Sequence, residues 1–384
     1  MTQKETKLAI GIVCYPSVGG SGIVASQLGI ALAQLGHKVH FISYDAPFLL
    51  DTKIKNITFH KVTFNDYELF KYPDYTLPLA VKMVEVSTKY TLDILHVHYA
   101  VPHATAALLA KDIAREEGLH FPNVVTTLHG TDITLLARDK NLMPVIKYSI
   151  ESSCGVTAVS GSLQNDTMKV LKTNRHIEVI HNFYTPKKVT KTSALTRKKL
   201  GIAPDDFLVI HLSNLRPVKR IPDLLAIIGK VKSNPRIKLL ILAGGDFAQY
   251  EPLVSSLGIT NQIIIRKNIK DIENYISAAD IGLYTSGEES FGMGILETMA
   301  YGKPVLATNA GGISEFMQHS KTGFLFKVGK VDDFAKKLLE LADNTALVKT
   351  LGSNAHLRAT MDFSSEKIVN QYVEYYKKIK KVCK

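Results

Sequence analysis

The chain has 384 residues, 46% of them hydrophobic, so it can bury a large core, is not disordered and is long enough for two domains. Its 47 Lys and Arg against 35 Asp and Glu give a formal net charge of +12, which favours an anionic partner such as a phosphorylated or carboxylated small molecule. Basic residues are spread along the chain without zinc-finger spacing, so we expect no nucleic-acid partner.

The cysteines and the N-terminal sequence indicate the compartment. Cys14, Cys154 and Cys383 are far apart and form no C-x-x-C pair, which argues against a disulfide framework and a zinc site. The N-terminus lacks the form of a signal peptide, and no apolar run approaches the roughly eighteen residues that span a bilayer. We therefore expect a cytoplasmic protein without stable membrane insertion, and the sequence leaves a homo-oligomer open. The basic C-terminal run KKIKKVCK is expected to be a solvated helix end, with a membrane surface as the alternative.

Short apolar runs in the first half predict strands of one sheet, at residues 8–14, 39–43, 94–99, 124–129, 156–160 and 177–182. Continuous Val, Ile and Leu runs between helical stretches are typical of parallel strands that are buried on both faces, which indicates α/β architecture. A polar, lysine-rich interval near 183–205 then interrupts the pattern. We place a domain boundary there, so that residues 1–183 form a Rossmann-like first domain.

A glycine-rich loop, YPSVGGSG, follows the first predicted strand and precedes an amphipathic helix that should stop at Gly36. Gly19, Gly20 and Gly22 allow a ligand to approach the backbone closely, and the helix N-terminus presents unpaired N–H groups to an anion. A plain strand-to-helix turn is the alternative, but such a turn seldom needs three glycines in four residues.

The same loop also suggests a dinucleotide-binding enzyme. Gly20, Gly22 and Ala25 fit G-x-G-x-x-A, and Asp45 ends the next predicted strand, as in NAD-dependent oxidoreductases. The match is weak, because four residues separate the strand from the first glycine, whereas in the fingerprint the glycine follows the strand directly.

Histidines follow two of the predicted strands. The stretch ILHVHYAVPH contains His96, His98 and His103, but no carboxylate or cysteine joins them at ligand spacing, so packing or hydrogen bonding is favoured over metal binding. In TTLHGTD, His129 comes just after a buried strand with Gly130 beside it, which favours a functional histidine over a structural one.

The second half repeats the strand and helix rhythm, with apolar runs at 207–213, 239–244, 263–266, 281–286 and 304–309. These runs predict a second doubly wound, Rossmann-like domain at 184–365. Apolar residues at helical spacing in the last segment predict a terminal helix at about 366–384 that packs back on the first domain. Ligands of such sheets bind beyond the carboxyl ends of the strands, so we expect the site there, in a cleft between the domains.

A basic turn in HLSNLRPVKRIPDLL follows the first strand of the second domain. Arg216, Lys219 and Arg220 precede a helix that should begin near Pro222, a position that suits phosphate recognition. A solvated basic turn is the common alternative.

The stretch ESFGMGILE places Glu289 before a predicted helix and Glu297 about one and a half turns into it. The N–H groups of Phe291, Gly292 and Met293 at the helix N-terminus can bind a diphosphate or a sugar oxygen. Glu297 is placed to accept from a ribose diol and Glu289 from sugar hydroxyls. A capping carboxylate and an exposed helical glutamate are the alternative.

Together, GGSG, HGTD, the Lys219 turn, Glu289-x7-Glu297 and GKPVLATNAGGISE resemble the retaining glycosyltransferases of family 4, which have the GT-B fold of two facing Rossmann-like domains. The resemblance covers essentially the whole chain. Within the family, CYPSVGGSG, ILHVHYAVPH and TTLHGTDIT are similar to members that transfer N-acetylglucosamine from UDP-N-acetylglucosamine to the hydroxyl of L-malate, the first step of bacillithiol biosynthesis.

The resemblance implies a role for each matching residue. It implies that the catalytic residues are His129, Lys219, Arg216 and Glu289. It implies that the donor is bound by Gly19, Gly20, Gly22, Asn268, Ser290, Phe291, Gly292, Met293 and Glu297, and the acceptor by Ser17, Tyr99, Thr131 and Lys147. The family's usual arginine falls at Asn214 here, so Arg216 would have to supply the second positive charge.

In retaining members of the family, the leaving phosphate oxygen takes the proton of the acceptor hydroxyl, so the resemblance implies no covalent intermediate, metal or other cofactor. Three alternatives remain: a family member that uses a lipid or polysaccharide acceptor, a nucleotide-sugar binding protein without turnover, and the oxidoreductase.

Overall fold

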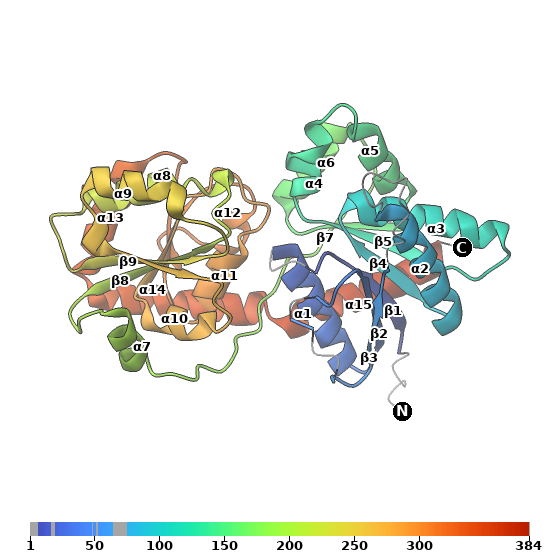
Figure 1. Cartoon of the computed structure of the whole chain (residues 1–384), viewed down its shortest axis with the longest axis horizontal. Coiled ribbons are helices and arrows are strands. Elements are labelled where there is room, and N and C mark those ends of the chain that lie inside the picture. The colour runs from blue at the N-terminus through green and yellow to red at the C-terminus, as the bar shows by residue number, and fades with distance from the viewer. Residues whose placement is uncertain (1–6, 17–19, 48, 51–52, 64–74, 384) are drawn as a thin grey trace. The chain divides into compact units, whose positions relative to one another are not determined.

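The computed structural model describes residues 7–16, 20–47, 49–50, 53–63 and 75–383. The chain divides into two compact units, the first formed by Met1–Asn182 with Ser365–Lys384 and the second by Phe183–Ser364. Each unit contains one parallel sheet with helices on both faces (Figure 1). The predicted α/β fold class, with two doubly wound sheets, is confirmed.

The first unit is built on a seven-stranded sheet in the order β3-β2-β1-β4-β5-β6-β7. Its strands are β1 Ala9–Val13, β2 Lys38–Ser43, β3 Ile57–Lys61, β4 Ile94–His98, β5 Asn123–Leu128, β6 Gly155–Ala158 and β7 Glu178–Val179. Because side chains alternate along a strand, Ile10 and Val13 lie on opposite faces of β1, and both are fully buried. The sheet is therefore covered on both faces. From β1 the chain goes to β2 on one side, and β4 is added on the other, which creates a topological switch point between β1 and β4.

The helices of this unit are α1 Gly20–Gln34, α2 Thr76–Tyr90, α3 Thr105–Glu116, α4 Thr131–Thr134, α5 Met143–Ser152, α6 Gly161–Leu171 and α15 Ser365–Val382, with short turns η1 Ala100–Ala104 and η2 Leu136–Arg138. The end of α1 lies just before Gly36, whose φ of +90° suits a glycine that terminates a helix. The start of α6 is capped by Ser160, whose side chain accepts from the N–H of Leu163 at 3.0 Å.

The C-terminal helix α15 belongs to the first unit, where Figure 1 shows it in red beside α1. Its buried face carries Tyr372, Tyr375, Tyr376 and Ile379 at helical spacing, and it contacts α1 and β5. The hydroxyl of Tyr375 donates to the carbonyl oxygen of Val156 at 3.1 Å. Burial and this hydrogen bond hold α15 against β6, a strand that lies more than 200 residues earlier in the sequence.

A disulfide joins Cys154, just before β6, to Cys383, just after α15. The expectation from the sequence, that the cysteines form no disulfide, is wrong here. The two residues are 229 positions apart, and their Cα atoms lie 5.9 Å apart because α15 returns to the first unit. The spacing of the cysteines along the chain carries no sign of this return.

The second unit has a six-stranded sheet in the order β10-β9-β8-β11-β12-β13. Its strands are β8 Phe207–Ser213, β9 Ile237–Ala243, β10 Ile263–Lys267, β11 Ile281–Tyr284, β12 Val305–Thr308 and β13 Gly323–Phe326. Side chains of β8 alternate between two cores: Val209 belongs to one hydrophobic cluster, and Leu208 and Ile210 belong to another. This strand is therefore covered on both faces, as its continuous apolar run predicts.

The helices of the second unit are α7 Ser193–Leu200, α8 Ile221–Lys230, α9 Glu251–Leu257, α10 Ile272–Ala278, α11 Met293–Ala300, α12 Ile313–Phe316, α13 Val331–Ala342 and α14 Thr345–Leu357. Short turns are η3 Pro217–Lys219, η4 Ala248–Tyr250, η5 Thr260–Gln262 and η6 Arg358–Asp362. Helices α8 and α13 contribute to the cluster of Val209, and α10 contributes to the other.

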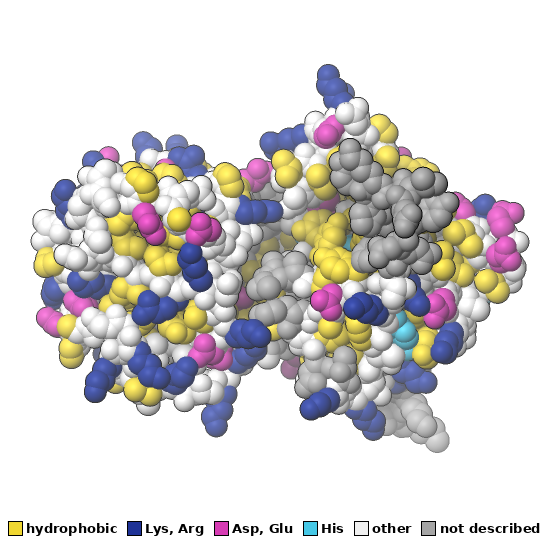
Figure 2. All heavy atoms as spheres, in the orientation of Figure 1, with side chains coloured by type: hydrophobic (Ala, Val, Ile, Leu, Met, Phe, Trp, Pro, Cys, Tyr) yellow, Lys and Arg dark blue, Asp and Glu magenta, His cyan; other side chains and the backbone are white. Residues whose placement is uncertain are grey.

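The basic residues do not form one block on the face that Figure 2 displays. There, Lys and Arg side chains are interspersed with acidic and neutral ones on both units. Among the residues that the structure describes, no helix has both the length and the apolar character that crossing a membrane requires.

Candidate active site

The polar loops of the second unit gather at the carboxyl edge of its sheet. The chain leaves β8 for β9 on one side, and β11 pairs with β8 on the other, so the switch point lies between β8 and β11. Lys219 lies in the loop after β8, and Glu289 lies in the loop after β11. Asn268 follows β10 at the same edge, with φ of +52° and its N–H donating to Ala243 at 3.1 Å. Loops that are distant in the sequence thus lie along one edge of the sheet.

Lys219 and Glu289 form an ion pair at the switch point. Nζ of Lys219 contacts Oε1 of Glu289, and the hydroxyl of Ser286 donates to the same oxygen at 2.9 Å. The two charged side chains are only 19% and 14% exposed, so water screens their charges less than at an open surface. The hydroxyl of Thr285 donates to the carbonyl oxygen of Lys219 at 3.0 Å and holds the basic turn against β11. The pair offers a cation for an anionic group and a carboxylate for hydroxyls.

The other basic residues of this turn differ in their surroundings. Arg216 is exposed, and its N–H donates to the side chain of Asn214 at 3.4 Å. Nε of Arg220 lies 2.8 Å from a carboxylate oxygen of Asp223, so Arg220 already has an ionic partner. Arg216 therefore lies in the predicted turn, and its role toward a ligand stays a prediction.

Helix α11 begins beside the ion pair. Gly292, the residue before it, has φ of +107°, a conformation that favours glycine. The side chain of Phe291 is buried and stacks on Phe316 with ring centroids 4.8 Å apart, so this side chain packs in the core and is not available to a ligand. A Cβ atom on Gly311 would lie 1.9 Å from the carbonyl oxygen of Glu289, so this glycine allows its loop to pack against the backbone of Glu289. Ser290 and Met293, the other predicted donor residues here, are half-buried.

Glu297 is a buried carboxyl group in α11, 8% exposed, so the alternative of an exposed helical glutamate is wrong. Burial raises its pKa from 4.5 to about 7, and the charge of Lys187 opposes this shift. The hydroxyl groups of Tyr184 and Tyr301 lie 3.1 Å apart. Burial raises the pKa of both, and the charge of Glu297 adds to this shift. A ligand that donates hydrogen bonds to this carboxyl group would stabilise its ionised form and so lower its pKa.

His211 is a buried residue of β8 that was not among the predicted site residues. Its Nδ1 donates to the carbonyl oxygen of Leu283 at 2.8 Å, and its Nε2 lies 2.8 Å from the hydroxyl of Ser213. Burial lowers its pKa to about 4, and the charges of Lys219 and Glu289 shift it in opposite directions. The sequence feature that could have identified His211 is its position as a polar residue inside the apolar run FLVIHLS.

In the first unit, aromatic side chains mark the switch point between β1 and β4. Tyr99 follows β4 with φ of +88°, and its N–H donates to Thr127 at 3.0 Å. The ring of Tyr99 lies 5.8 Å from that of Tyr15 and 5.3 Å from that of His129, measured between centroids. Tyr99 and His129, predicted separately from the sequence, are therefore neighbours.

The loop that carries His129 is shaped by Asp132. Gly130 has φ of +114°, and its N–H donates to Oδ1 of Asp132 at 2.9 Å. Asp132 is fully buried; burial raises its pKa to about 6, and hydrogen bonds from backbone N–H groups oppose this shift. This carboxyl group therefore stabilises the loop by accepting from its backbone. Thr131 begins α4 directly after the glycine.

The remaining predicted residues of the first unit have different positions. Gly20 and Gly22 lie in the first turn of α1, whereas Ser17 and Gly19 lie outside the described residues. Lys147 lies on α5, with Nζ 3.4 Å from the carbonyl oxygen of Lys172 and 3.8 Å from a carboxylate oxygen of Glu151. Its described contacts are therefore not with Tyr99 or Thr131.

The histidines of ILHVHYAVPH are buried and engaged in hydrogen bonds. His96 contacts Thr127 at 2.6 Å, and His103 donates to the carbonyl oxygen of His98. In the part of the chain that the structure describes, no group of three or more His, Cys, Asp or Glu side chains could hold a metal ion.

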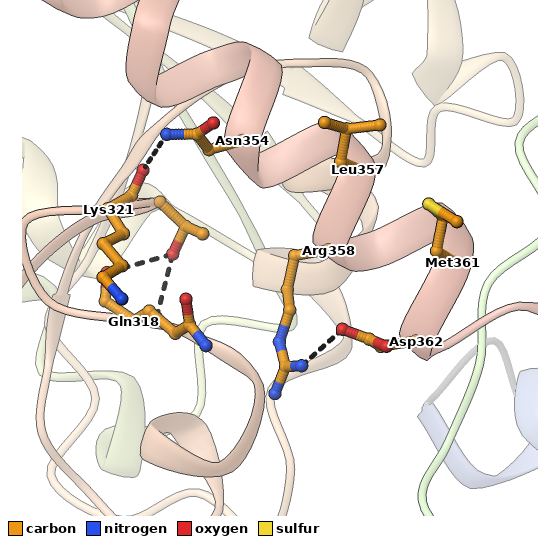
Figure 3. Close-up of a pocket in the computed structure, with 8 residues that line it drawn as sticks. Gln318, Lys321, Asn354, Leu357, Arg358, Met361 and Asp362 are labelled. Carbon is orange, nitrogen blue, oxygen red and sulfur yellow. Dashed lines mark hydrogen bonds and ion pairs between the residues drawn. The ribbon is translucent and has the colours of Figure 1, made fainter.

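A cavity of about 400 Å³ lies elsewhere in the second unit, beside α14 and η6. It is lined by Gln318, Lys321, Thr322, Asn354, Leu357, Arg358, Met361 and Asp362 (Figure 3). Arg358 points toward Asp362 and is paired with it, and the side-chain amide of Asn354 donates to the backbone of Lys321. None of the lining residues belongs to the predicted site.

Comparison with known proteins gives relatives for both units. Residues 18–188 match the family model Glycosyltransferase Family 4, and residues 193–358 match Glycosyl transferases group 1. N-acetyl-alpha-D-glucosaminyl L-malate synthase of Bacillus anthracis is 42% identical over 372 residues, 96% of this chain and 97% of that protein. Alpha-monoglucosyldiacylglycerol synthase of Acholeplasma laidlawii is 26% identical over 381 residues, 90% of each chain.

Solved structures share the fold. The crystal structure of Anabaena HepE in complex with UDP and glucose has a TM-score of 0.79 at 22% identity, with 97% of this chain and 100% of that chain covered. The complex of the same protein with UDP-glucose has a TM-score of 0.80 at 21% identity and the same coverage.

Proposed function

The chain belongs to glycosyltransferase family 4 and has the GT-B fold, and we propose that it transfers N-acetylglucosamine from UDP-N-acetylglucosamine to the hydroxyl of L-malate, the first step of bacillithiol biosynthesis. The observation that carries this proposal is the 42% identity to the Bacillus anthracis synthase, which extends over 96% of the chain. Anabaena HepE, a solved protein of the same fold, holds UDP and glucose in one complex and UDP-glucose in another, which supports a UDP-sugar as the donor.

The proposed donor site is the carboxyl edge of the second sheet. The diphosphate would be held by Lys219, Arg216 and the N–H groups at the start of α11. The ammonium group of Lys219 has three N–H bonds, so it can keep Glu289 and still donate to phosphate. Both described hydrogen bonds of the Glu289 side chain use Oε1, so Oε2 can accept from a hydroxyl of the transferred sugar. Glu297 would accept from the ribose, and the backbone at Asn268 would meet the uracil.

The proposed reaction retains the configuration of the sugar. The bond between the anomeric carbon and the phosphate oxygen breaks, the bond to the malate oxygen forms on the same face, and the leaving phosphate oxygen takes the malate proton. Negative charge grows on the diphosphate, and Lys219 is placed to stabilise it. Tyr99 and Thr131 would contact malate, as would Ser17 and Lys147, and His129 would hydrogen-bond the sugar.

UDP release from UDP-N-acetylglucosamine, measured against a panel of hydroxy acids and diacylglycerol, tests the proposal. We expect release with L-malate, at the same rate when EDTA is present, because the roles above need no metal. Release that depends on diacylglycerol would favour the lipid acceptor of the Acholeplasma relative. Binding of the donor without release with any acceptor would favour a nucleotide-sugar binding protein.

A further inference from the structure

A second buried histidine lies directly against His129. His98 is the last residue of β4 and is fully buried, whereas His129 follows β5 and is partly exposed. Nδ1 of His98 lies 2.8 Å from Nε2 of His129, and the rings are stacked with centroids 5.0 Å apart. One of these two nitrogens must carry the proton of the hydrogen bond, so the tautomer of one neutral ring determines that of the other.

The second ring nitrogen of His98 decides the direction of this hydrogen bond. Among the residues that the structure describes, the buried Nε2 of His98 has no hydrogen-bond partner. If Nε2 carried the proton, a buried N–H group would lack an acceptor, which is rare in folded proteins. The proton of His98 therefore lies on Nδ1, and Nδ1 donates to Nε2 of His129.

His103 shows the same tautomer in the same cluster. Its Nδ1 contacts the carbonyl oxygen of His98, and because a carbonyl oxygen can only accept, this Nδ1 carries a proton. Burial lowers the pKa of His103 to about 4, so its Nε2 carries none near neutral pH. That nitrogen is also buried without a partner among the described residues, so the cluster tolerates an unpaired lone pair.

Both rings of the pair are neutral near physiological pH. Burial and the neighbouring histidine rings lower the pKa of His98 well below its usual range and that of His129 to about 3. A neutral imidazole carries one proton. If His129 accepts at Nε2, its own proton is on Nδ1.

We propose that His98 is a positioning residue, which donates from Nδ1 to Nε2 of His129 and thereby holds His129 in the tautomer with its proton on Nδ1. His129 then offers a hydrogen-bond donor to an oxygen of the bound sugar and cannot act as a base at Nε2. This inference rests on the proposed function, because it takes the ligand of His129 to be the sugar of the donor. It agrees with a reaction in which the leaving phosphate takes the acceptor proton.

Hydrogen bonds on the other side of His98 support this arrangement. The ring of His96 packs against that of His98, with centroids 4.4 Å apart. The hydroxyl of Tyr376 on α15 lies 2.7 Å from Nδ1 of His96, and Nε2 of His96 lies 2.6 Å from the hydroxyl of Thr127. Since both nitrogens of His96 are engaged, its ring cannot turn without breaking a buried hydrogen bond. The C-terminal helix thus contributes to the support of His98.

Long-range proton–nitrogen NMR correlation on isotope-labelled histidines reports which nitrogen of His129 is protonated, and His129→Gln assigns its signals. In the wild type we expect the proton on Nδ1. In His98→Leu, which lacks the donor, we expect a second tautomer and a kcat lower by roughly 10- to 100-fold, the range for residues that orient a reactive group. The KM for the donor should change less. His98→Asn, whose amide nitrogen can replace Nδ1, should keep the tautomer and most of kcat.

His37→Asn is the matched control. His37 is buried in the same unit, and its Nδ1 accepts from the N–H of Leu8 at 3.0 Å, outside the described contacts of the pair. It should change neither the tautomer of His129 nor kcat.

A proton on Nε2 of His129 in the wild type overturns the proposal, as does His98→Leu with an unaltered tautomer and kcat. If His98→Leu does not fold, the wild-type spectrum and His98→Asn still decide. The NMR measurement needs no turnover, so the expected tautomer in a protein without transferase activity would support the positioning of His129 by His98 and would contradict the proposed function, and with it the sugar as the ligand of His129.

Discussion

Glu297 is a carboxyl group that burial keeps partly protonated near neutral pH, since its pKa is raised from 4.5 to about 7. If ribose hydroxyls donate to it, they stabilise the ionised form. We therefore expect the affinity for UDP-N-acetylglucosamine to rise with pH through about 7, and Glu297→Gln to remove this dependence. Calorimetric titration at several pH values measures it, with the nucleotide sugar as ligand because its diphosphate does not titrate in this range. An unchanged pH dependence in the variant would reject the ribose role.

Protein stability gives a second measurement on the same residue. Between pH 4.5 and about 7 the folded state binds more protons at Glu297 than the unfolded state, so the free energy of unfolding falls as pH rises through this window. Glu297→Gln carries no such charge and should be more stable than the wild type above the window by roughly 3 kcal/mol. Urea unfolding at both ends of the window checks this. A difference that does not vary with pH would show that burial of the charge is not its cause.

We expect Lys219 to contribute to catalysis by stabilising the negative charge of the leaving diphosphate. We expect Lys219→Met to lower kcat/KM by roughly 100- to 1000-fold, the range for removing one preorganised donor from a developing negative charge. Lys230→Met is the control, because Lys230 pairs with Asp332 at the surface and its side chain is 58% exposed. Initial rates of UDP release compare the two variants. Equal losses of kcat/KM in both variants would mean that the net charge of the protein, and not the position of Lys219, is responsible.

Some of the site could be predicted from single residues, and some could not. A predicted strand precedes each of Lys219, Glu289 and Glu297, so the sequence was enough to predict that they lie beyond the carboxyl edge of the sheet. The ion pair between the first two was not, because 70 residues separate them and only the strand order makes them neighbours. Tyr184 beside Glu297 lies in the polar interval that marked the domain boundary, where no motif singled it out.

Among the elements, the terminal helix α15 allows a separate test of packing against covalent linkage. Its apolar face carries the buried side chains of Tyr372, Tyr376 and Ile379, and we expect this burial to hold the helix even without the disulfide. We expect Cys383→Ser to lower the stability of the oxidised protein by roughly 2 to 4 kcal/mol while α15 keeps its protection against hydrogen exchange. Mass spectrometry of peptides measures the exchange and identifies the cross-link to Cys154. Loss of protection along the whole helix would show that the disulfide, and not burial, holds it.

Every central strand of the two described sheets was predicted, as was the edge strand β10, whereas the edge strands β3 and β13 were missed. The run predicted at 207–213 is β8, Phe207–Ser213, which is central and covered on both faces. The edge strand β3 was not predicted, because ITFHK is only partly buried and includes polar residues. The edge strand β13 was also missed, and the last two residues of GFLF are only partly buried. At the opposite edge of the first sheet, the predicted run 177–182 shortens to Glu178–Val179.

For the whole molecule, the repeated strand and helix rhythm was enough to predict two α/β units. It could not predict the strand order of either sheet, which sets the two switch points and therefore the positions of Tyr99 and Lys219. The pairing of Cys154 with Cys383 was also not predicted: the terminal helix was expected to pack on the first domain, but the sequence did not indicate which strand its end would lie against. The resemblance to family 4, which depends on short motifs and not on topology, is confirmed by the matches to both family models.

The most direct test of the account is NMR observation of the product as it forms from UDP-N-acetylglucosamine and L-malate. We expect equal amounts of UDP and of a single glycoside, with the sugar joined to the malate hydroxyl and the α configuration of the donor retained. A β-linked product, or hydrolysis to free N-acetylglucosamine while malate stays unchanged, would contradict it.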